Sequence, residues 1–529
     1  MGTGQKQKRN KLIIQSLVFS FPQNRGMITT VSGCEDAEYS RKNGGIHLKI
    51  IIIGGGVVGC AIARQLSRYE ADITLLEGGV DVAEGASKAN SAIVHAGFDA
   101  KPGTMKAKLN VDGAKMYPRL CQEVGAPYGQ PGAMVLAFLP EERATIETLY
   151  QQGIENGVEE LRIIERDEIL QLEPNTNPNV QCALLVPTSG LTSPYELTYA
   201  LADHAAVNGV TFIMNAFVSQ VRKEDGRFVL ETTKGEMQAD LIVNCAGIGS
   251  GELHNQLSDR KVKLIPRKGE YYLLDHVQPL LFTRTMFQCP SKMGKGVLVS
   301  PTLHGNTILG PSAEDVEDAS DVATTAQALA MVNERSRMTW PGLNLRNVIT
   351  TFAGIRAHEE NGDFIIGAVE GCPGAYETVG VESPGLSAAP AIAELLVGQI
   401  ASENQLSEKM EWKPAPVRNK PFYAMTLEER VEAVKENADY GAIVCRCEQV
   451  TEAEIRAAIR RPVGATTIDG VKRRTRAGMG RCQGGFCSPR VLEILAEELG
   501  IDPTQVTKGG GNSQLLVSTI AQAMGKGDA

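Results

Sequence analysis

Apolar residues along this chain follow two alternating patterns. Short continuous runs rich in Ile and Val predict buried strands of a parallel sheet, and the first run spans residues 46–53. Residues 57–69 carry apolar side chains at helical spacing, and residues 72–76 form a second strand-like run. Together these segments predict one β-α-β unit near the start of the chain.

The same alternation continues to about residue 400. Helical spacing returns in residues 141–157, 324–335 and 386–400. Further strand-like runs lie at residues 210–213, 228–232, 241–244, 296–300 and 307–309, and the last two are expected to pair in an antiparallel sheet. The pattern therefore predicts the α/β fold class.

Beyond residue 400 the pattern changes. Residues 401–440 are polar and contain prolines, which is typical of a linker. Residues 441–500 form a compact segment, and residues 501–529 are expected to be a loosely attached tail. Residues 1–46 combine a basic stretch with a moderately apolar one and lack a clear signal-peptide cleavage site, so we expect a disordered extension.

Composition narrows the class of protein only slightly. The 529 residues are 43% hydrophobic and 22% charged, which is ordinary globular material for two to four domains. The net charge of −9 argues against nucleic acid as a partner. Because no run of 18 apolar residues occurs, no helix is expected to span a membrane, while peripheral membrane contact stays open.

A glycine-rich motif follows the first predicted strand and opens the first predicted helix. Its sequence Gly54-Gly55-Gly56-Val57-Val58-Gly59 fits G-x-G-x-x-G, in which the first glycine permits a tight turn and the second lets backbone approach a pyrophosphate. The third glycine allows close helix–strand packing. Glu77 ends the second predicted strand, where a carboxylate accepts hydrogen bonds from a ribose diol and would repel a 2′-phosphate. The motif argues against NADP and leaves both FAD and NAD open.

Four of the eleven cysteines form two close pairs. They are Cys445 and Cys447 in C-R-C, and Cys482 and Cys487 in C-Q-G-G-F-C. Four thiolates suit zinc or an iron–sulfur cluster, and these spacings differ from the C-x2-C pairs of zinc ribbons. The other seven cysteines are scattered singly, which favours a reducing compartment and a cytoplasmic location over a disulfide scaffold.

Several short motifs resemble one family of flavoproteins. The matching segments are Ser87-Lys88-Ala89-Asn90-Ser91, His95-Ala96-Gly97, Ser193-Pro194-Tyr195-Glu196-Leu197, Asn244-Cys245-Ala246-Gly247, Gly269-Glu270-Tyr271-Tyr272, Ala353-Gly354-Ile355-Arg356 and Ser383-Pro384-Gly385-Leu386. Residues 48–400 thereby resemble the FAD-dependent oxidoreductases of the D-amino-acid-oxidase-like superfamily. Within it the resemblance is nearest to anaerobic glycerol-3-phosphate dehydrogenase large subunits and L-2-hydroxyglutarate dehydrogenases. It implies an oxidoreductase domain over residues 47–400, with a substrate subdomain at roughly 120–190 and 266–345.

The resemblance also implies which residues meet FAD. Ser87, Asn90 and Ser91 would lie along the pyrophosphate and the flavin, and Val218 would meet the adenine through its backbone. Ala246 and Gly247 would lie alongside the ribityl chain. The backbone N–H groups of Gly385 and Leu386 would face the flavin pyrimidine edge, where negative charge develops on reduction and where the following helix adds its dipole.

Two residues are candidates for the chemistry. His95, in a V-H-A-G context that is similar to I-H-G-G of the glycerol-3-phosphate dehydrogenases, would accept the hydroxyl proton of an alcohol; the alternative is a histidine packed against the flavin. Arg356 would hold a carboxylate or phosphate; the alternative is an ion pair within the flavin domain. Weaker candidates are His304 and His358 for the base, and Arg267 and Lys268 for the anion.

The paired cysteines resemble the bacterioferritin-associated-ferredoxin-like [2Fe-2S] domain, a small helical module. Gly480 and Gly484-Gly485-Phe486 would form turns that bring backbone N–H groups to the sulfurs. Residues 445–490 hold ten Lys or Arg against four Asp or Glu, so positive charge is expected to offset the cluster or to face a partner. Structural zinc stays open as the alternative.

The fold class expected from both resemblances is α/β: a Rossmann-type FAD-binding domain with an inserted mixed-sheet substrate domain, plus a small helical iron–sulfur domain. The implied function is FAD-dependent oxidation of a small anionic secondary alcohol, with sn-glycerol 3-phosphate preferred. Electrons would pass from flavin through a [2Fe-2S] cluster to a second dehydrogenase or electron-acceptor subunit. Alternatives are L-2-hydroxyglutarate, an imino or amino acid of the hydroxyproline type, and an electron-transfer subunit without its own substrate.

Overall fold

A parallel sheet forms the first layer of the fold. The computed structural model describes residues 48–276, 279–290 and 296–518. Its first sheet has six strands in the order β20-β21-β13-β1-β2-β9, and only β20 runs antiparallel to its neighbour. The strands are β1 (Lys49–Ile53), β2 (Asp72–Leu76), β9 (Thr211–Ile213), β13 (Leu241–Asn244), β20 (Ile365–Ala368) and β21 (Ala375–Val379). Segments more than 300 residues apart therefore share one sheet, as expected for a Rossmann-type domain built from discontinuous pieces.

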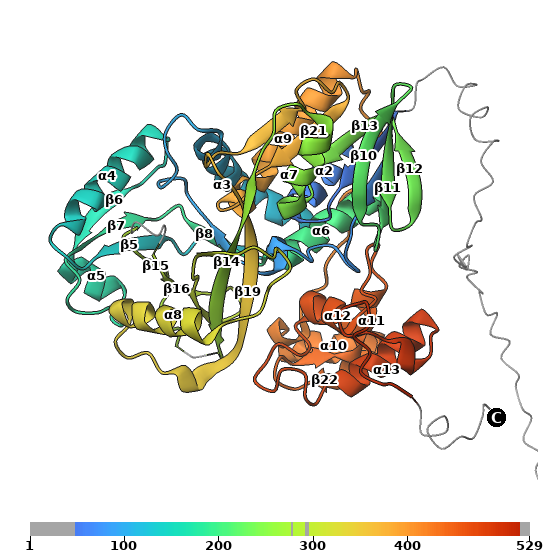
Figure 1. Ribbon diagram of the computed structural model, residues 1–529. Helices are drawn as coiled ribbons and strands as arrows, with labels where there is room; N and C mark the ends of the chain where they lie inside the picture. Colours follow the sequence, from blue (N-terminus) through green and yellow to red (C-terminus); the bar gives the residue numbers. More distant parts are fainter. Residues whose placement is uncertain (1–47, 277–278, 291–295, 519–529) are drawn as a thin grey trace, which may run out of the picture. The chain divides into compact units, whose positions relative to one another are not determined.

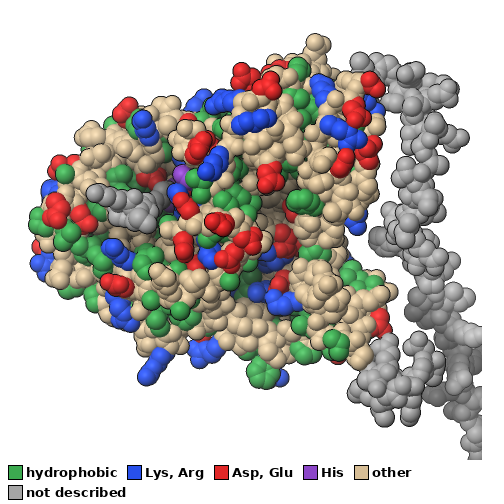
Figure 2. Space-filling model, viewed as in Figure 1, with side chains coloured by type: hydrophobic (Ala, Val, Ile, Leu, Met, Phe, Trp, Pro, Cys, Tyr) green, Lys and Arg blue, Asp and Glu red, His purple; other side chains and the backbone are tan. Residues whose placement is uncertain are grey.

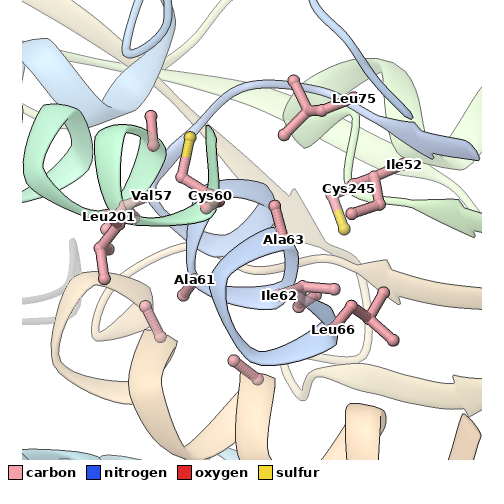
Figure 3. Close-up of a cluster of buried hydrophobic side chains, with 14 of the residues drawn as sticks. Ile52, Val57, Cys60, Ala61, Ile62, Ala63, Leu66, Leu75, Leu201 and Cys245 are labelled. Atoms are coloured by element: carbon pink, nitrogen blue, oxygen red, sulfur yellow. The ribbon is translucent and has the colours of Figure 1, made fainter. Parts of the chain in front are cut away.

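Each face of this sheet is covered because strand side chains alternate between the two faces. Ile50 and Ile52 point into a core shared with helices, whereas Ile51 and Ile53 belong to a core shared with an antiparallel meander. The helices are α2 (Val57–Leu66), α3 (Met105–Val124), α6 (Pro194–Val207) and α9 (Gly385–Glu403). The meander is β10 (Val218–Glu224), β11 (Arg227–Thr232) and β12 (Gly235–Ala239), with α7 (Ser250–Leu257) beside it. Figure 3 shows the helical core, in which Cys60 and Leu66 of α2 lie among the side chains of neighbouring elements.

The second layer is a mixed sheet of nine strands (Figure 1). Its strands are β5 (Ala133–Ala137), β6 (Arg162–Glu165), β7 (Cys182–Val186), β14 (Leu264–Leu274), β15 (Thr285–Gln288), β16 (Leu298–Pro301), β17 (Thr307–Gly310), β18 (Glu314–Asp315) and β19 (Val348–Glu359). Strands β5 and β15 are parallel and the other pairs are antiparallel, so the inserted mixed sheet is confirmed. Helices α4 (Glu142–Glu155), α5 (Arg166–Leu172) and α8 (Ala326–Thr339) pack on it. Because β19 pairs with β14 along most of its length, the sheet continues past residue 345 to Glu359.

A three-stranded sheet lies between these parts. It consists of β3 (Ile93–Val94), β8 (Gly190–Thr192) and β4 (Tyr128–Gly129). Strand β3 leads directly to His95, and β8 leads into α6. The small sheet thus fixes the backbone directly before the predicted base.

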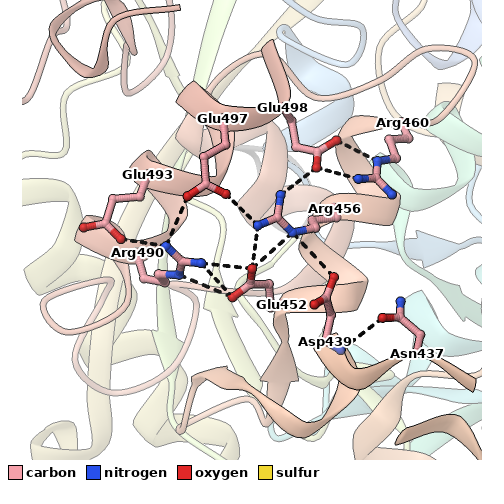
Figure 4. A network of polar contacts seen from close by, with 9 residues as sticks. All are labelled: Asn437, Asp439, Glu452, Arg456, Arg460, Arg490, Glu493, Glu497 and Glu498. Atoms are coloured by element: carbon pink, nitrogen blue, oxygen red, sulfur yellow. Dashed lines mark hydrogen bonds and ion pairs between the residues drawn. The ribbon is translucent and has the colours of Figure 1, made fainter. Parts of the chain in front are cut away.

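The third part is a helical domain with its own apolar core, in orange to red in Figure 1. It contains α10 (Leu427–Glu436), β22 (Ile443–Cys445), β23 (Val450–Thr451), α11 (Glu452–Ile459), α12 (Ile468–Thr475) and α13 (Ser488–Leu499). Thr451 and Glu454 form a capping box that starts α11. Arg456 of α11 pairs with Glu497 and Glu498 of α13, each at 2.6 Å (Figure 4). The small helical domain is therefore confirmed.

Two expectations about the C-terminal region need correction. The segment 401–440, expected as a linker, carries helix α10, whose capping box of Thr426 and Glu429 starts it locally. The first part of the expected loose tail is packed: Val506 is 1% exposed in the helical domain's core, and Lys508 pairs with Asp469 at 2.9 Å. The extension 1–46 and residues 519–529 lie outside the described residues.

Among the described residues, one helix is long and apolar enough to cross a membrane by length and composition alone. This helix is α9, and its residues Ala388, Ile392 and Leu396 are fully buried within the protein. It contacts α2 and α3. Its apolarity is therefore accounted for by packing in the core.

Charge is distributed without a single dominant area on the face drawn in Figure 2. Basic and acidic side chains are interspersed there across the described residues.

Candidate functional site

A cavity of about 680 Å³ lies between the two large sheets. Its walls come from the carboxyl ends of β1 and β2, the segment 85–95, the start of α9, and strands β14, β15, β16 and β19 of the second sheet. The carboxyl edge of a parallel sheet is where ligands of doubly wound folds bind. A second cavity of about 530 Å³, lined by residues of α2, α3 and α9, contains none of the predicted site residues.

The glycine motif lines one end of the larger cavity and requires glycine at two positions. Gly54 has φ +108°, and a Cβ there would lie 2.4 Å from the carbonyl oxygen of Cys245. A Cβ on Gly59 would lie 2.0 Å from the carbonyl oxygen of Gly54. Gly59 therefore sits under the loop and lets α2 pack closely, as expected for a third glycine. Gly54, Gly56, Val57 and Val58 face the cavity itself.

Glu77 lies where the sequence predicts a ribose-binding acid. It follows β2, lines the cavity, and accepts backbone N–H groups from Gly55 at 2.7 Å and from Gly79 at 2.6 Å. Burial raises the pKa of its carboxyl, while these two hydrogen bonds act in the opposite direction. The carboxylate thus fastens the glycine loop to the segment after β2.

The remaining residues predicted to contact the cofactor converge on the same cavity. They are Ser87, Asn90, Ser91, Val218, Ala246, Gly247, Gly385 and Leu386. Ser87 Oγ accepts the N–H of Val57 at 2.9 Å, at the start of α2. Gly385 and Leu386 begin α9, so a helix N-terminus is directed at the other end of the cavity. Cavity size, glycine cradle, acid and helix ends together fit FAD.

His95 is buried against the cavity wall with 6% exposure. Its backbone N–H donates to Ser387 Oγ at 2.7 Å, and Ser387 in turn donates to the carbonyl of Ile93 at 3.4 Å. The His95 ring lies 5.7 Å from the ring of Phe287 on β15. The first turn of α9 and the second sheet therefore hold this histidine from two sides.

Arg356 reaches the same cavity from β19. Its Nη2 donates to the carbonyl of Ser312 at 2.9 Å, which fixes one arm of the guanidinium. Its Nε is buried and has no hydrogen-bond partner among the described residues. A buried donor without a partner is costly, so this arm is suited to an anionic group entering the cavity.

The weaker candidates do not line the cavity. His304 pairs with Glu196 at 2.8 Å, and His358 pairs with Glu382 at 3.0 Å. Arg267 pairs with Asp315 at 2.6 Å. Lys268 is 2% exposed and pairs with Asp321 at 2.8 Å, so its charge is neutralised within the protein and is not simply solvated at a strand end.

Three residues at the site were not singled out from sequence. Ser387 supports His95, Tyr271 lines the cavity while stacked on Phe352 at 4.7 Å, and Glu382 lines it while paired with Lys106 at 3.0 Å. Tyr271 and Ser387 lie within or next to motifs that resemble the family, which was the available signal. Glu382 directly precedes the same motif as Ser387, but the contacts that hold it come from Lys106 and His358 in distant segments.

The four paired cysteines converge in the helical domain as two pairs. Cys447 and Cys482 have their sulfurs 3.9 Å apart. Cys445 hydrogen-bonds with Cys487, which lowers the pKa of Cys445 to about 6. Each iron of a [2Fe-2S] cluster takes two of four thiolates, so two pairs fit a binuclear cluster. No three His, Cys, Asp or Glu side chains in the described ranges gather as one zinc ion would require.

Glycine turns bring backbone N–H groups to these sulfurs, as the sequence predicts. The N–H groups of Phe486, Gly484 and Gly485 lower the pKa of Cys482 by hydrogen bonding to its sulfur. A Cβ on Gly480 would lie 2.3 Å from the Cβ of Cys447, so this position requires glycine. Such N–H groups orient thiolate ligands and stabilise their charge.

The two pairs differ in exposure. Cys445 and Cys487 are buried at 2% and 3%, whereas Cys447 is exposed and Cys482 is half-buried. Phe486, beside them, is 88% exposed. One side of the predicted cluster is therefore open to solvent.

Comparison with known proteins agrees with this geometry. Residues 49–399 match the family described as FAD dependent oxidoreductase, and residues 443–497 match the BFD-like [2Fe-2S] binding domain. A glycerol 3-phosphate dehydrogenase of Caloramator mitchellensis is 46% identical over 88% of this chain and 98% of its own length. An L-2-hydroxyglutarate dehydrogenase of Arabidopsis thaliana is 28% identical over 65% of this chain and 81% of its own.

A solved structure is similar as well. The L-alpha-glycerophosphate oxidase of Mycoplasma pneumoniae, solved with FAD bound, is 30% identical, with a TM-score of 0.67 over 71% of this chain and 99% of that one. The fold, the glycine cradle and the paired thiols thus agree with the family matches. The chain belongs to the FAD-dependent oxidoreductases, with FAD as one cofactor and, in a C-terminal BFD-like domain, a [2Fe-2S] cluster as the other.

Proposed function

We propose that this enzyme oxidises sn-glycerol 3-phosphate to dihydroxyacetone phosphate and delivers the electrons, through its cluster, to a protein acceptor. The observation that carries the proposal is Arg356, which lines the cavity together with His95 and whose buried Nε has no partner among the described residues. A permanently charged guanidinium can bind an anionic group, and a nearby histidine can accept a hydroxyl proton, so the pair suits an anionic alcohol.

The substrate choice is supported by the relatives. The dehydrogenase of Caloramator mitchellensis matches both parts of this chain, since its alignment spans 468 residues against 351 in the flavin-domain match. L-2-hydroxyglutarate is the second candidate, because a relative named for that substrate is 28% identical. An imino or amino acid is the third; its oxidation does not require a base for a hydroxyl proton.

FAD would be held by the glycine motif (Gly54, Gly56, Val57, Val58, Gly59), Glu77, Ser87, Asn90, Ser91, Val218, Ala246, Gly247, Gly385 and Leu386. When bound, it supplies the acceptor for a hydride from the substrate carbon. His95 would accept the hydroxyl proton, and its fixed backbone keeps the ring in one position. Arg356 would hold the phosphate.

Cys445, Cys447, Cys482 and Cys487 would bind the cluster, with the exposed Cys447 side facing the acceptor. The acceptor is proposed to be a second subunit of a dehydrogenase complex. We assign residues 47–400 to the oxidoreductase domain, including the substrate subdomain, and residues 441–500 to the cluster domain. A reducing, cytoplasmic location is supported by the cysteines of the described residues, which are free thiols.

An anaerobic titration tests the proposal. Glycerol 3-phosphate is expected to bleach the flavin absorption near ~450 nm, a general property of flavins. Bleaching by L-2-hydroxyglutarate or by an amino acid, and none by glycerol 3-phosphate, would replace the substrate. If no hydroxy acid, phosphorylated alcohol or amino acid bleaches the flavin, the chain is an electron-transfer subunit without its own substrate.

EPR of the dithionite-reduced protein tests the cluster separately. A rhombic signal with about two irons per chain is expected. Stoichiometric zinc without such a signal would contradict the cluster assignment.

A further inference from the structure

The segment between Glu77 and Lys88, called here the 78–88 loop, is part of the flavin site at both of its ends. Glu77 and Gly79 at its start are joined by a 2.6 Å hydrogen bond, and Glu77 also holds Gly55 of the glycine motif. Ser87 near its end accepts the N–H of Val57. Both ends line the cavity that fits FAD. The conformation of this loop therefore decides whether several FAD contacts exist together.

The middle of the 78–88 loop turns away from the cavity and contacts the helical C-terminal domain. Asp81, 3% exposed, receives both arms of Arg474 from α12, at 2.5 and 2.8 Å. The Arg474 side chain is 1% exposed, and its guanidinium lies 3.8 Å from the ring of Tyr199 on α6. This is a buried, bidentate ion pair between residues 393 positions apart.

A second pair lies next to the first. Arg473 donates to the hydroxyl of Tyr199 at 2.6 Å and forms an ion pair with Glu84 of the 78–88 loop. Glu84 also pairs with Lys88, the neighbour of Ser87. The C-terminal domain thus reaches the FAD-lining end of the loop through one carboxylate.

Apolar contacts accompany these ion pairs. Val82 and Ala83 of the loop are 0% exposed and share an apolar core with Val463 of the C-terminal domain. Asp203 of α6, also 0% exposed, accepts the N–H of Val463 at 2.8 Å and pairs with Arg461. Two buried aspartates of the flavin domain, Asp81 and Asp203, are therefore neutralised by arginines of the other domain.

We propose that the C-terminal domain acts as a clamp on the flavin site: Arg473 and Arg474 hold the 78–88 loop in the conformation that binds FAD. Removing one partner of a buried ion pair leaves an uncompensated charge that draws water, so the loop must rearrange. Because Glu77 and Ser87 end the same loop, the rearrangement weakens FAD binding. Arg473 and Arg474 are positioning residues, since they line no part of the cavity.

The test measures FAD affinity directly in the full chain. Deflavinated Arg473→Gln and Arg474→Gln proteins are titrated with FAD, and binding is followed by quenching of flavin fluorescence. Both dissociation constants are expected to rise about tenfold or more. The EPR signal of the reduced cluster is measured on the same samples and is expected to be unchanged. Hydrogen exchange in the 78–88 loop is expected to be faster.

The control is Arg490→Gln. Arg490 belongs to the same domain and pairs with Glu452, Glu493 and Glu497 (Figure 4), so this substitution removes a more exposed ion-pair network whose partners lie outside the 78–88 loop. Its FAD dissociation constant is expected to equal that of the wild type. An unchanged FAD constant in both Arg473→Gln and Arg474→Gln would overturn the proposal, as would an equal rise in Arg490→Gln.

One variant is designed for the case in which Arg474→Gln loses cluster as well as FAD. Arg473→Lys keeps the charge but does not offer the two arms that reach Tyr199 and Glu84 together. A raised FAD constant with a normal cluster signal in this variant supports the clamp. An unchanged constant refutes it.

Discussion

Arg356 offers the sharpest test of the proposed substrate site. The Arg356→Gln variant loses the hydrogen bond from Arg356 Nη2 to the Ser312 carbonyl. It also loses the charged guanidinium, including the Nε donor that has no partner among the described residues. A hydrogen bond from a charged donor contributes about 1.5–3 kcal/mol. Two such bonds to one phosphate amount to about 3–6 kcal/mol, which corresponds to about 10²- to 10⁴-fold in kcat/KM. Because Arg356 is only half-buried, water replaces part of this interaction, and we expect the lower end, about 10²-fold.

The loss is expected mainly in KM, because an anion-binding residue holds substrate and transition state alike. The assay is steady-state oxidation of glycerol 3-phosphate with an artificial electron acceptor. The KM of Arg356→Lys should lie between those of the wild type and Arg356→Gln, since lysine keeps the charge but lacks the two-armed guanidinium. Arg346→Gln is the matched control: Arg346 is exposed, precedes the same strand, and its side chain makes no hydrogen bond or ion pair with the described residues. An unchanged KM in Arg356→Gln would refute the anion-binding role.

The other predictions concern the base, the cluster and acid stability. His95→Asn is expected to lower kcat for an alcohol by about 10²- to 10⁴-fold with FAD still bound, and an unchanged kcat would leave only a packing role. In Gly480→Ala the new Cβ meets Cys447, so cluster binding should weaken about 10- to 100-fold by EPR quantification, whereas Gly441→Ala, whose Cβ has an ordinary 3.7 Å contact, should not change it. Burial lowers the pKa of His204 to about 4, and the positive charge of Arg64, whose Nε–H it accepts, acts in the same direction. The unfolded state therefore binds this proton first, and about 1–3 kcal/mol of stability present above about pH 6.5 is lost as the pH falls to about 4. Denaturant unfolding of His204→Asn should lack this component; an unaltered pH slope would contradict it.

Several features of the flavin site follow from short stretches of sequence. The glycine motif, the helix after it and Glu77 lie within one β-α-β unit, so spacing alone places them on one loop edge. The segment 72–76 is observed as β2 with the same limits. Helix α10 was missed because four of its ten residues are Glu and its apolar side chains are few, so the stretch resembled a polar linker.

Local sequence patterns do not predict that His95 and Arg356 line the same cavity. They are separated by 261 positions and come together because β3 pairs with β8 while β19 pairs with β14. Ser387, 292 positions from His95, supports it only through the packing of α9. No local periodicity carries such information, since it arises from long-range pairing.

In the C-terminal domain, too, sequence predicted some features and the tertiary structure decided others. Cysteine spacing predicted a four-thiolate site, because two short C-x-C and C-x4-C pairs are typical of metal ligands. Which thiols pair, Cys447 with Cys482 and Cys445 with Cys487, was decided only by the fold. The excess of Lys and Arg there was expected to offset the cluster or face a partner. Three of these residues, Arg461, Arg473 and Arg474, pair with carboxylates of the flavin domain, a role that depends on how two separately patterned segments pack against each other.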